Sequence, residues 1–166
     1  MSPTTTVRLA RADDLPAVAS LRWRWVVVEN GAADALGREE FVDAFVAWAA
    51  TRATTHRCVV AERGGVVIGM AWLALTARVP SPRAPHRLSD DLQCVYVVPD
   101  ARDHGLGTRL VEAVVTEADR LGVERVVVHS SERAVPGYDR AGFASDERLR
   151  HRSLHPVDVP RDVRGA

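Results

Sequence analysis

The sequence predicts an α/β fold in which strands and helices are mixed along one chain. Short valine-rich runs, bounded by glycine, proline or charged residues, indicate strands. Segments with apolar residues at helical spacing separate these runs and predict amphipathic helices. The length of 166 residues suits one domain with a full hydrophobic core. We therefore expect a single domain over residues 1–155.

The first half of the chain predicts a strand, two helices and a strand pair. We expect strands at 7–11, 58–63 and 66–75. We expect helices at 13–30, capped by Asp13 or Asp14, and at 37–52. Gly64-Gly65 indicates a hairpin turn between the strands 58–63 and 66–75. Gly69, inside the second of these strands, indicates a bend or a close backbone approach.

The second half predicts three further strands and two helices. Before these elements, residues 78–91 contain three prolines and are expected to form one long irregular loop. The expected elements are 92–98 (strand), 106–121 (helix, closed by Gly122), 123–130 (strand), 132–141 (short helix) and 149–154 (half-exposed strand). Residues 156–166, with Pro156 and Pro160, predict a loose tail.

The stretch from Leu92 to Gly122 places a strand, a glycine-rich turn and a helix in succession. The first turn of a helix has N–H groups without intrahelical partners and carries partial positive charge. Gly105 and Gly107 lack the Cβ atoms that keep an anion away from the backbone, and Arg102 adds a fixed charge. Two glycines by themselves also suit a plain tight turn. The succession of strand, arginine, glycine-rich turn and helix favours a binding site for an anion such as pyrophosphate.

Two motifs resemble one known family. Arg102-x-x-Gly105-x-Gly107 after a Val-x-Val-x-Pro strand resembles the acetyl-CoA-binding motif of the GCN5-related N-acetyltransferases (GNAT). The segment 138–143, Tyr-Asp-Arg-Ala-Gly-Phe, resembles a second motif of that family. One helix and one strand lie between the motifs, as in the family. The resemblance implies a central mixed, mostly antiparallel, splayed sheet of six to seven strands, flanked by about four helices.

The resemblance also implies where acetyl-CoA binds. In the family, main-chain groups of the strand that here holds Val95 and Val97 pair with the pantetheine arm and polarise the acetyl carbonyl. Ser131 or Ser130 stands where the family often has an asparagine that contacts the coenzyme. By this resemblance, the residues expected to bind the coenzyme are Val95, Val97, Arg102, Asp103, His104, Gly105, Leu106, Gly107, Thr108, Ser131 and Tyr138.

Tyr138 is the candidate general acid, because the corresponding tyrosine of the family lies near the coenzyme sulfur and can protonate the departing thiolate. The alternative is a packing tyrosine on a short helix. The general base is open, since an amine of pKa ~10 must lose a proton before it attacks a thioester. Asp91 is the candidate base, with Asp90 beside it; both also suit solvated loop positions. Gln93 could orient a water.

Other polar residues have weaker indications. His86 lies in the long loop, and His129 ends a strand, where it suits an edge position. Glu29 and Asn30 are the side chains suited to contact the amine acceptor, as the corresponding region often does in the family. His151 and His155 have no third ligand nearby, so no metal site is expected.

Composition excludes several classes of protein. The formal net charge is zero, which leaves no electrostatic footprint for nucleic acid. No apolar stretch approaches the ~20 residues that span a bilayer, and no secretion signal is visible at the N-terminus. Cys58 and Cys94 lie in apolar runs and are expected to be reduced core residues. We therefore expect a cytoplasmic protein without nucleic-acid or membrane partners.

Together these features predict an acetyl-CoA-dependent N-acetyltransferase. Its acceptor would be a primary amine of a small molecule or peptide, attacking directly in a ternary complex without a metal, in a monomer or homodimer. One alternative is a non-catalytic acyl-CoA-binding sensor or interaction module. A nucleotide-binding Rossmann domain fits less well, because the glycine motif comes late and no β-α-β unit with a ribose-binding acid follows it.

Overall fold

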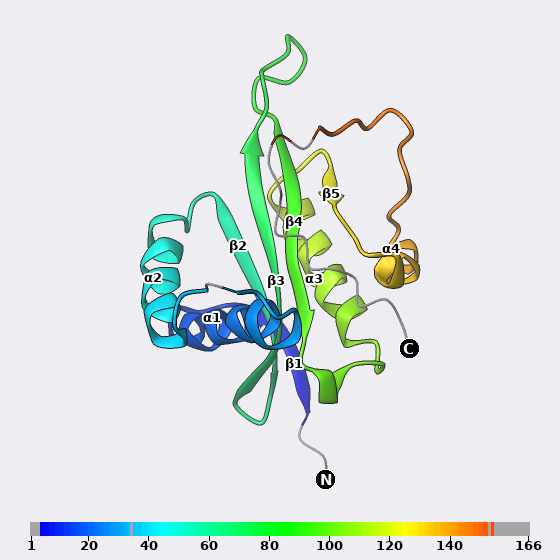
Figure 1. Cartoon of the computed structure of the whole chain (residues 1–166). Coiled ribbons are helices and arrows are strands. Elements are labelled where there is room, and N and C mark those ends of the chain that lie inside the picture. Colours follow the sequence, from blue (N-terminus) through cyan, green and yellow to red (C-terminus); the bar gives the residue numbers. More distant parts are fainter. Residues whose placement is uncertain (1–3, 34, 153, 155–166) are drawn as a thin grey trace.

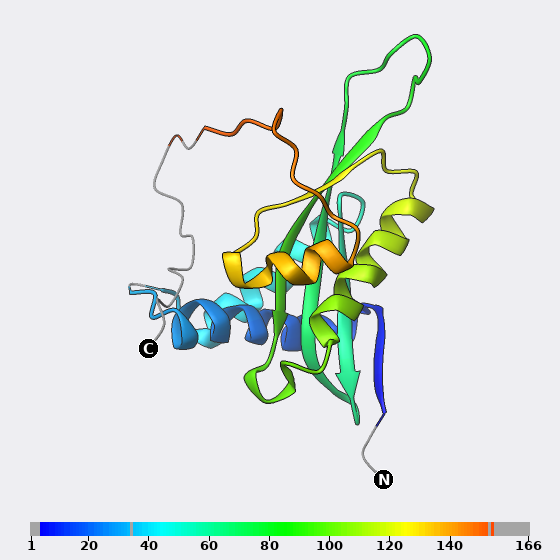
Figure 2. The same ribbon diagram turned by 90° about the vertical axis from the view of Figure 1, so that its right-hand side faces the viewer.

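The structure, a computed structural model, describes residues 4–33, 35–152 and 154. A five-stranded sheet forms its centre, with helices on both faces (Figures 1 and 2). The strands are β1 (Thr5–Leu9), β2 (His56–Arg63), β3 (Val66–Ala77), β4 (Leu88–Val97) and β5 (Val126–Val128). The helices are α1 (Leu15–Trp23), α2 (Arg38–Thr51), α3 (Leu106–Arg120) and α4 (Val135–Arg140). A π-helical segment, η2 (Arg24–Glu29), prolongs α1.

The strands follow each other in the order β1-β2-β3-β4-β5. All neighbours are antiparallel except β4 and β5, which are parallel. The predicted mixed, mostly antiparallel sheet is therefore confirmed, with five strands in the described part of the chain rather than six to seven. Helices α1 and α2 cover one face, and α3 and α4 lie on the other (Figure 1).

The sheet opens between β4 and β5. The two strands pair only from Asp90↔Val126 to Leu92↔Val128, whereas β4 continues to Val97. Within the described residues, the stretch 93–97 thus has a strand neighbour on the β3 side alone. This is the predicted splay, and it leaves main-chain groups of β4 facing the gap.

Two apolar clusters hold the layers together. Leu110 and Val114 of α3 are fully buried against Leu73 and Leu92 of β3 and β4. On the other face the helix α1 packs on a second cluster, whose fully buried members are Val18, Val60 and Met70. The helix α3 ends as predicted: Gly122 has φ +72°, and the Val123 N–H donates to the Ala118 carbonyl at 3.0 Å.

Gly69 lets β3 approach its neighbours closely. A Cβ at this position would lie 3.0 Å from the Tyr96 carbonyl oxygen and 3.1 Å from Cδ1 of Leu110. Both distances are shorter than ordinary van der Waals contacts. The predicted close backbone approach is confirmed, and it brings the strand pair β3–β4 under the helix α3.

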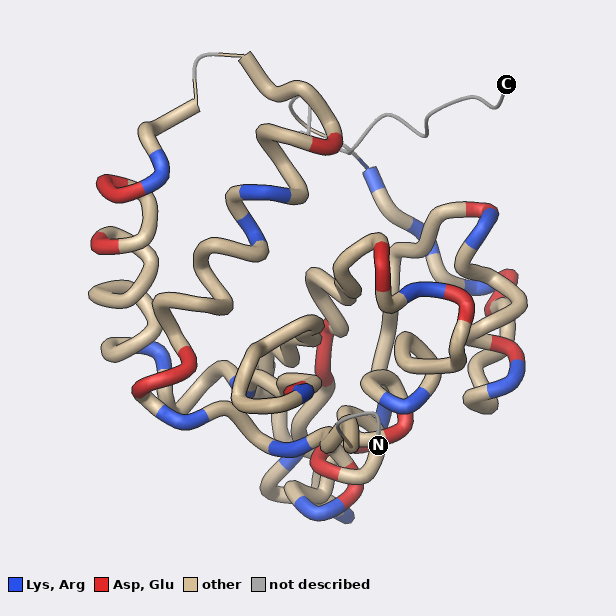
Figure 3. Tube along the Cα trace, turned by 90° about the horizontal axis from the view of Figure 1, so that it is seen from below, with Lys and Arg blue, Asp and Glu red and all other residues tan. Residues whose placement is uncertain are grey.

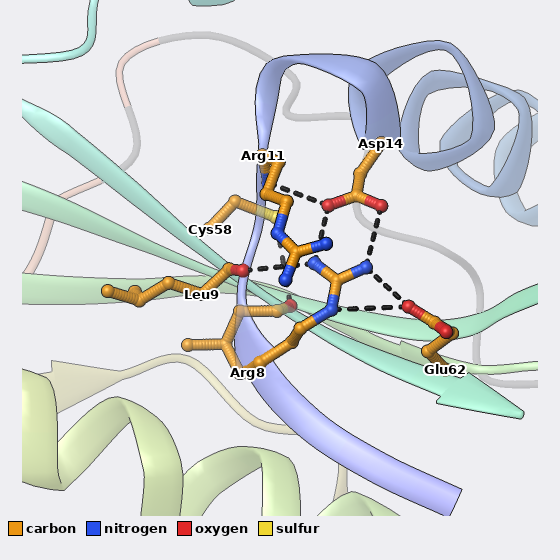
Figure 4. Close-up of polar contacts among 7 residues, drawn as sticks. Arg8, Leu9, Arg11, Asp14, Cys58 and Glu62 are labelled. Carbon is orange, nitrogen blue, oxygen red and sulfur yellow. Dashed lines mark hydrogen bonds and ion pairs between the residues drawn. The ribbon is translucent and has the colours of Figure 1, made fainter. Parts of the chain in front are cut away.

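An ion-pair cluster fastens β1 to the following turn and to β2 (Figure 4). The Arg8 guanidinium donates to both carboxylate oxygens of Asp14, at 2.6 and 2.9 Å, and its Nε donates to Glu62 at 3.2 Å. The Asp14 carboxylate also accepts the Arg11 N–H at 2.6 Å. Hydrogen bonding from Arg8 holds the pKa of Asp14 below its usual value. Asp14 directly precedes α1, as expected, but its side chain binds Arg8 instead of capping the helix.

Two further sequence expectations were wrong. The loop expected over 78–91 ends earlier, because Ser89, Asp90 and Asp91 pair with β3 through backbone bonds that polar side chains do not prevent. Of the strand expected over 149–154, the described residues 149–152 and 154 form none; Leu149 is 57% exposed, so no buried face stabilises the alternating pattern. The expected tail over 156–166 lies outside the described residues.

The charges are spread over the molecule. Acidic and basic positions are both scattered along the chain trace, and neither kind gathers on one side (Figure 3). Among the described helices, none is long and apolar enough to cross a membrane.

Candidate active site

The strand β4 contains a β-bulge where it leaves β5. Trp72 pairs with Gln93 and Met70 pairs with Tyr96, so Cys94 and Val95 together stand opposite one residue of β3. Cys94 has φ +55°, a conformation that residues with a Cβ rarely adopt. A bulge re-aims the backbone and is over-represented beside active sites. Nothing in the apolar run 92–98 indicates this bulge.

The glycine turn follows β4 and opens the helix α3. Asp103 and Gly105 have φ +63° and +72°. The first N–H groups of α3, those of Leu106, Gly107 and Thr108, lack intrahelical acceptors by helix geometry. A Cβ at Gly105 or at Gly107 would meet nothing within 4 Å. The space outside the turn is therefore open, and these residues fit an anion such as a pyrophosphate.

The side chain of Arg102 is held beside this turn by Glu29. The Arg102 guanidinium donates to the Glu29 carboxylate at 2.7 Å and, through Nε, to the Val97 carbonyl at 2.8 Å. It also lies 5.4 Å from the centre of the Tyr96 ring, and the Tyr96 hydroxyl donates to Glu29. Glu29 is thus the counterion of the Arg102 charge beside the turn.

Glu29 connects the end of η2 to the glycine turn. Burial disfavours its charged form, but hydrogen bonds from Tyr96 and Arg102 and the charges of Arg102 and Arg24 outweigh burial, so the pKa of Glu29 lies below its usual value. Burial first, and then the bond to Glu29, raise the pKa of Tyr96 to about 12. Glu29 was expected to meet the acceptor. In the structure its carboxylate accepts hydrogen bonds from Arg102 and Tyr96 beside the glycine turn.

Asn30, the other expected acceptor residue, closes the π-helical segment. Its Nδ2 donates to the Trp25 carbonyl at 2.8 Å, and its backbone N–H donates to the same oxygen at 3.1 Å. The structure therefore uses both Glu29 and Asn30 for contacts within the chain.

Tyr138 lies on α4, beyond the gap between β4 and β5. It is 9% exposed and meets the Phe143 ring edge-to-face at 5.4 Å. Burial raises the pKa of Tyr138, so its phenol stays protonated at neutral pH and can serve as a proton donor. Gly142 (φ +84°) ends the helix, and the Phe143 N–H donates to the Tyr138 carbonyl at 3.0 Å. The segment 138–143 thus also caps the C-terminus of α4.

A cavity of about 590 Å³ lies beside Tyr138. It is bounded by β5, α4 and the segment 141–146, with Ser130 in its wall, and no residue of the turn 102–107 lines it. The neighbouring Ser131 accepts the Ala134 N–H at 3.0 Å through its carbonyl. An exposed contact of 3.9 Å between Arg133 and Asp103 links this region to the turn.

The strand β4 separates the two aspartates onto opposite faces. The Asp91 carboxylate accepts the Gln93 Nε2 at 2.8 Å, and both residues face α1 and α2. Asp90 faces the other way, is 1% exposed, and has no hydrogen-bond partner on either carboxylate oxygen in the described structure. Burial raises the pKa of Asp90 to about 6. Asp91 lies on the side of the sheet where Gln93 lines a small pocket, whereas Asp90 lies on the α3 side; neither aspartate lines a pocket itself.

That pocket, here called the aromatic pocket, has a volume of about 50 Å³. Its apolar wall is formed by Phe45, Trp48, Met70 and Trp72, and its polar wall by Arg22, Gln93 and Cys94. The pocket therefore reaches the β-bulge from beneath α1 and α2. No local pattern in the sequence indicates that Arg22 reaches this pocket.

The remaining candidates lie elsewhere. His86 is exposed on the hairpin that joins β3 and β4, and the His129 ring contacts the His151 ring at 5.3 Å. His155 lies outside the described residues. Across the described ranges, no three histidine, cysteine, aspartate or glutamate side chains are grouped to hold a metal. Both cysteines are free; Cys58 is buried and Cys94 partly buried.

Comparisons with known proteins agree with this architecture. Residues 18–143 match the model of the acetyltransferase (GNAT) family. The uncharacterised N-acetyltransferase YhfO of Bacillus subtilis (strain 168) is 29% identical over 154 residues, which cover 90% of this chain and 96% of that protein.

Solved structures show the same fold. A predicted acetyltransferase from Clostridium acetobutylicum, crystallised with acetyl-CoA, superposes with a TM-score of 0.72 at 20% identity over 91% of this chain and 97% of the other. A GCN5-related N-acetyltransferase from Ralstonia eutropha JMP134 superposes with a TM-score of 0.67 at 24% identity, covering 92% of this chain and all of the other (100%).

Proposed function

Because the chain belongs to the acetyltransferase (GNAT) family, we propose that it transfers the acetyl group of acetyl-CoA to a primary amine. The observation that carries the proposal is the β-bulge at Cys94, which lies between an open glycine turn and a pocket on the other face. A donor bound along one side of β4 and an acceptor bound on the other would meet at this point of the strand.

The coenzyme is assigned to the gap beside β4. The N–H groups of Leu106, Gly107 and Thr108 would hold its pyrophosphate, because they point out of the first turn of α3 into open space. Main-chain groups of residues 94–97 face the gap and would pair with the pantetheine arm. Acetyl-CoA supplies a thioester, whose carbonyl carbon accepts the amine.

The chain's own groups would direct three events. The backbone at the bulge orients N–H groups toward the developing oxyanion. Asp91, bonded to Gln93, accepts the proton that the amine releases as its nitrogen attacks the carbonyl carbon. The C–S bond breaks with its electron pair on sulfur, and Tyr138 donates its phenolic proton to that thiolate. Neither cysteine serves as a nucleophile, because burial raises the pKa of Cys58 and of Cys94.

Acetyl-CoA binding can be tested at Gly107. In Gly107→Val the added Cβ meets no protein atom within 4 Å, and the side chain enters the space assigned to the pyrophosphate. We expect calorimetry to show acetyl-CoA binding weakened about tenfold or more, since losing ~1.4 kcal/mol of contacts already gives that factor. Gly37→Val is the matched control, because a Cβ at Gly37 also meets nothing. Equal affinity of both variants would remove the turn from the site.

Catalysis is tested with Tyr138→Phe. Thiol release from acetyl-CoA across a panel of amines should fall about 10²- to 10⁴-fold, the usual contribution of a general acid, whereas acetyl-CoA affinity should hardly change. Undiminished turnover would refute the acid role. Tight acetyl-CoA binding by the wild-type protein, with no thiol release from any amine, would instead support the non-catalytic acyl-CoA-binding module.

A further inference from the structure

The aromatic pocket has a cation at its edge without a counterion. Arg22 is half-buried, and its guanidinium lies 4.9 Å from the centre of the Trp25 ring. Among the residues that the structure describes, no carboxylate lies within 4.0 Å of it. No acidic residue lines the pocket either. Guanidinium groups stay charged in proteins and match a carboxylate with two parallel hydrogen bonds. Arg22 is thus suited to an anionic group of a ligand.

The polar wall that holds Arg22 also suits an amine. Gln93 lines it, and Asp91, two residues earlier on the same face of β4, accepts the Gln93 amide at 2.8 Å. The bulge at Cys94, to which the proposed function assigns the acetyl carbonyl, forms part of the same wall. A ligand in this pocket therefore meets Arg22 and, on the same polar wall, Gln93, whose amide binds the carboxylate that would receive the amine proton.

The apolar wall limits what else the ligand carries. The rings of Phe45, Trp48 and Trp72 contact one another, with each pair of centroids 5.6 Å apart, so the wall is closely packed. The volume of about 50 Å³ is about a third of the ~150 Å³ that holds a benzene ring. The pocket has room for a methyl or ethyl group rather than a ring. Trp48 is 37% exposed, so the pocket opens to solvent beside it.

From these features we propose that the acceptor is a small aliphatic amino carboxylate, such as an α-amino acid with a side chain of one or two carbons. Its carboxylate pairs with Arg22, its side chain enters the apolar wall, and its amine faces Gln93 and the bulge. The inference rests on the proposed function, because the bulge marks the acetyl group only if the chain uses acetyl-CoA. The product would be the N-acetyl amino acid, with free CoA.

The test compares matched amines in a thiol-release assay with acetyl-CoA. Alanine and 2-aminobutyrate carry the carboxylate, alaninamide and isopropylamine lack it, and phenylalanine carries a ring. We expect kcat/KM for alanine to exceed that for alaninamide, isopropylamine and phenylalanine by about tenfold or more. Arg22→Gln should lower kcat/KM for alanine about 10- to 100-fold, the usual effect of losing a charged hydrogen bond, and leave that for isopropylamine unchanged.

Two further variants separate charge from folding. Arg22→Lys keeps the charge and should retain part of the activity with alanine. Arg38→Gln removes an exposed arginine of α2 and should change nothing. Equal use of alanine and alaninamide, or an Arg22→Gln variant as active as the wild type on alanine, would overturn the inference while the proposed function stands.

Failure of the proposed function gives a different result. If no amine releases thiol, tryptophan fluorescence still reports the pocket, because Trp48 and Trp72 line it. A spectral change on adding alanine to the acetyl-CoA-saturated protein, lost in Arg22→Gln, would support the carboxylate site without catalysis. No change with alanine at millimolar concentration would overturn it.

Discussion

Replacing Asp90 by asparagine tests whether a buried carboxyl in β4 destabilises the fold at neutral pH. Asp90 is 1% exposed, and neither of its oxygens has a hydrogen-bond partner in the described structure. Burial raises the pKa of Asp90 from 3.8 to about 6. Asparagine has nearly the same shape but does not ionise, so Asp90→Asn removes the titration and keeps the volume.

The sign follows from the two pKa values. Because the folded pKa lies above the unfolded one, the folded state keeps its proton to higher pH, and stability is lost as the pH rises from about 4 to about 6. Ionising the buried group reduces the free energy of unfolding by about 3 kcal/mol once the pH exceeds both values. Asp90→Asn should therefore gain about 2 to 3 kcal/mol relative to the wild type between pH 4 and pH 8.

Urea unfolding at several pH values measures this difference. Comparing the change between pH values cancels the constant cost of burying an amide instead of a carboxylic acid. Asp91→Asn is the matched control, since Asp91 is the next residue, faces the other way and has the Gln93 amide as partner. If the stabilities of wild type and Asp90→Asn change with pH in parallel, within about 0.5 kcal/mol, the carboxyl is solvated or paired and the reasoning fails.

Two further predictions concern the packing around the site. Gly69→Ala should destabilise the fold by about 1 to 3 kcal/mol and lower Tm by several degrees, because its Cβ would lie 3.0 Å from the Tyr96 carbonyl oxygen; an unchanged melting curve by scanning calorimetry would contradict this. Glu29→Gln should cost about 1 kcal/mol at pH 7 through weaker bonds to Arg102 and Tyr96. Because the pKa of Glu29 is lowered, this deficit should shrink as the pH falls through that pKa, and a deficit that persists in acid would argue against the carboxylate as its source.

Local patterns in the sequence were enough to predict most of the elements. Helical spacing in α3, the C-cap at Gly122 and the hairpin turn at Gly64-Gly65 all depend on residues close together in the chain. The glycine turn at Gly105 and Gly107 was visible for the same reason, since glycines act through their own backbone. The predicted ends of strands were less accurate where polar residues extend a strand, as Ser89 to Asp91 do in β4.

The sequence by itself determined the order of strands and helices, the glycine turn and the family resemblance, because these depend on neighbouring residues. Only the tertiary structure decided how the site is assembled. It paired Glu29 with Arg102, set Asp90 and Asp91 on opposite faces, and bent β4 at Cys94. It also brought Arg22 to the pocket at that bend. The reason is physical: side chains distant in sequence meet only after sheet register and helix packing have set their positions.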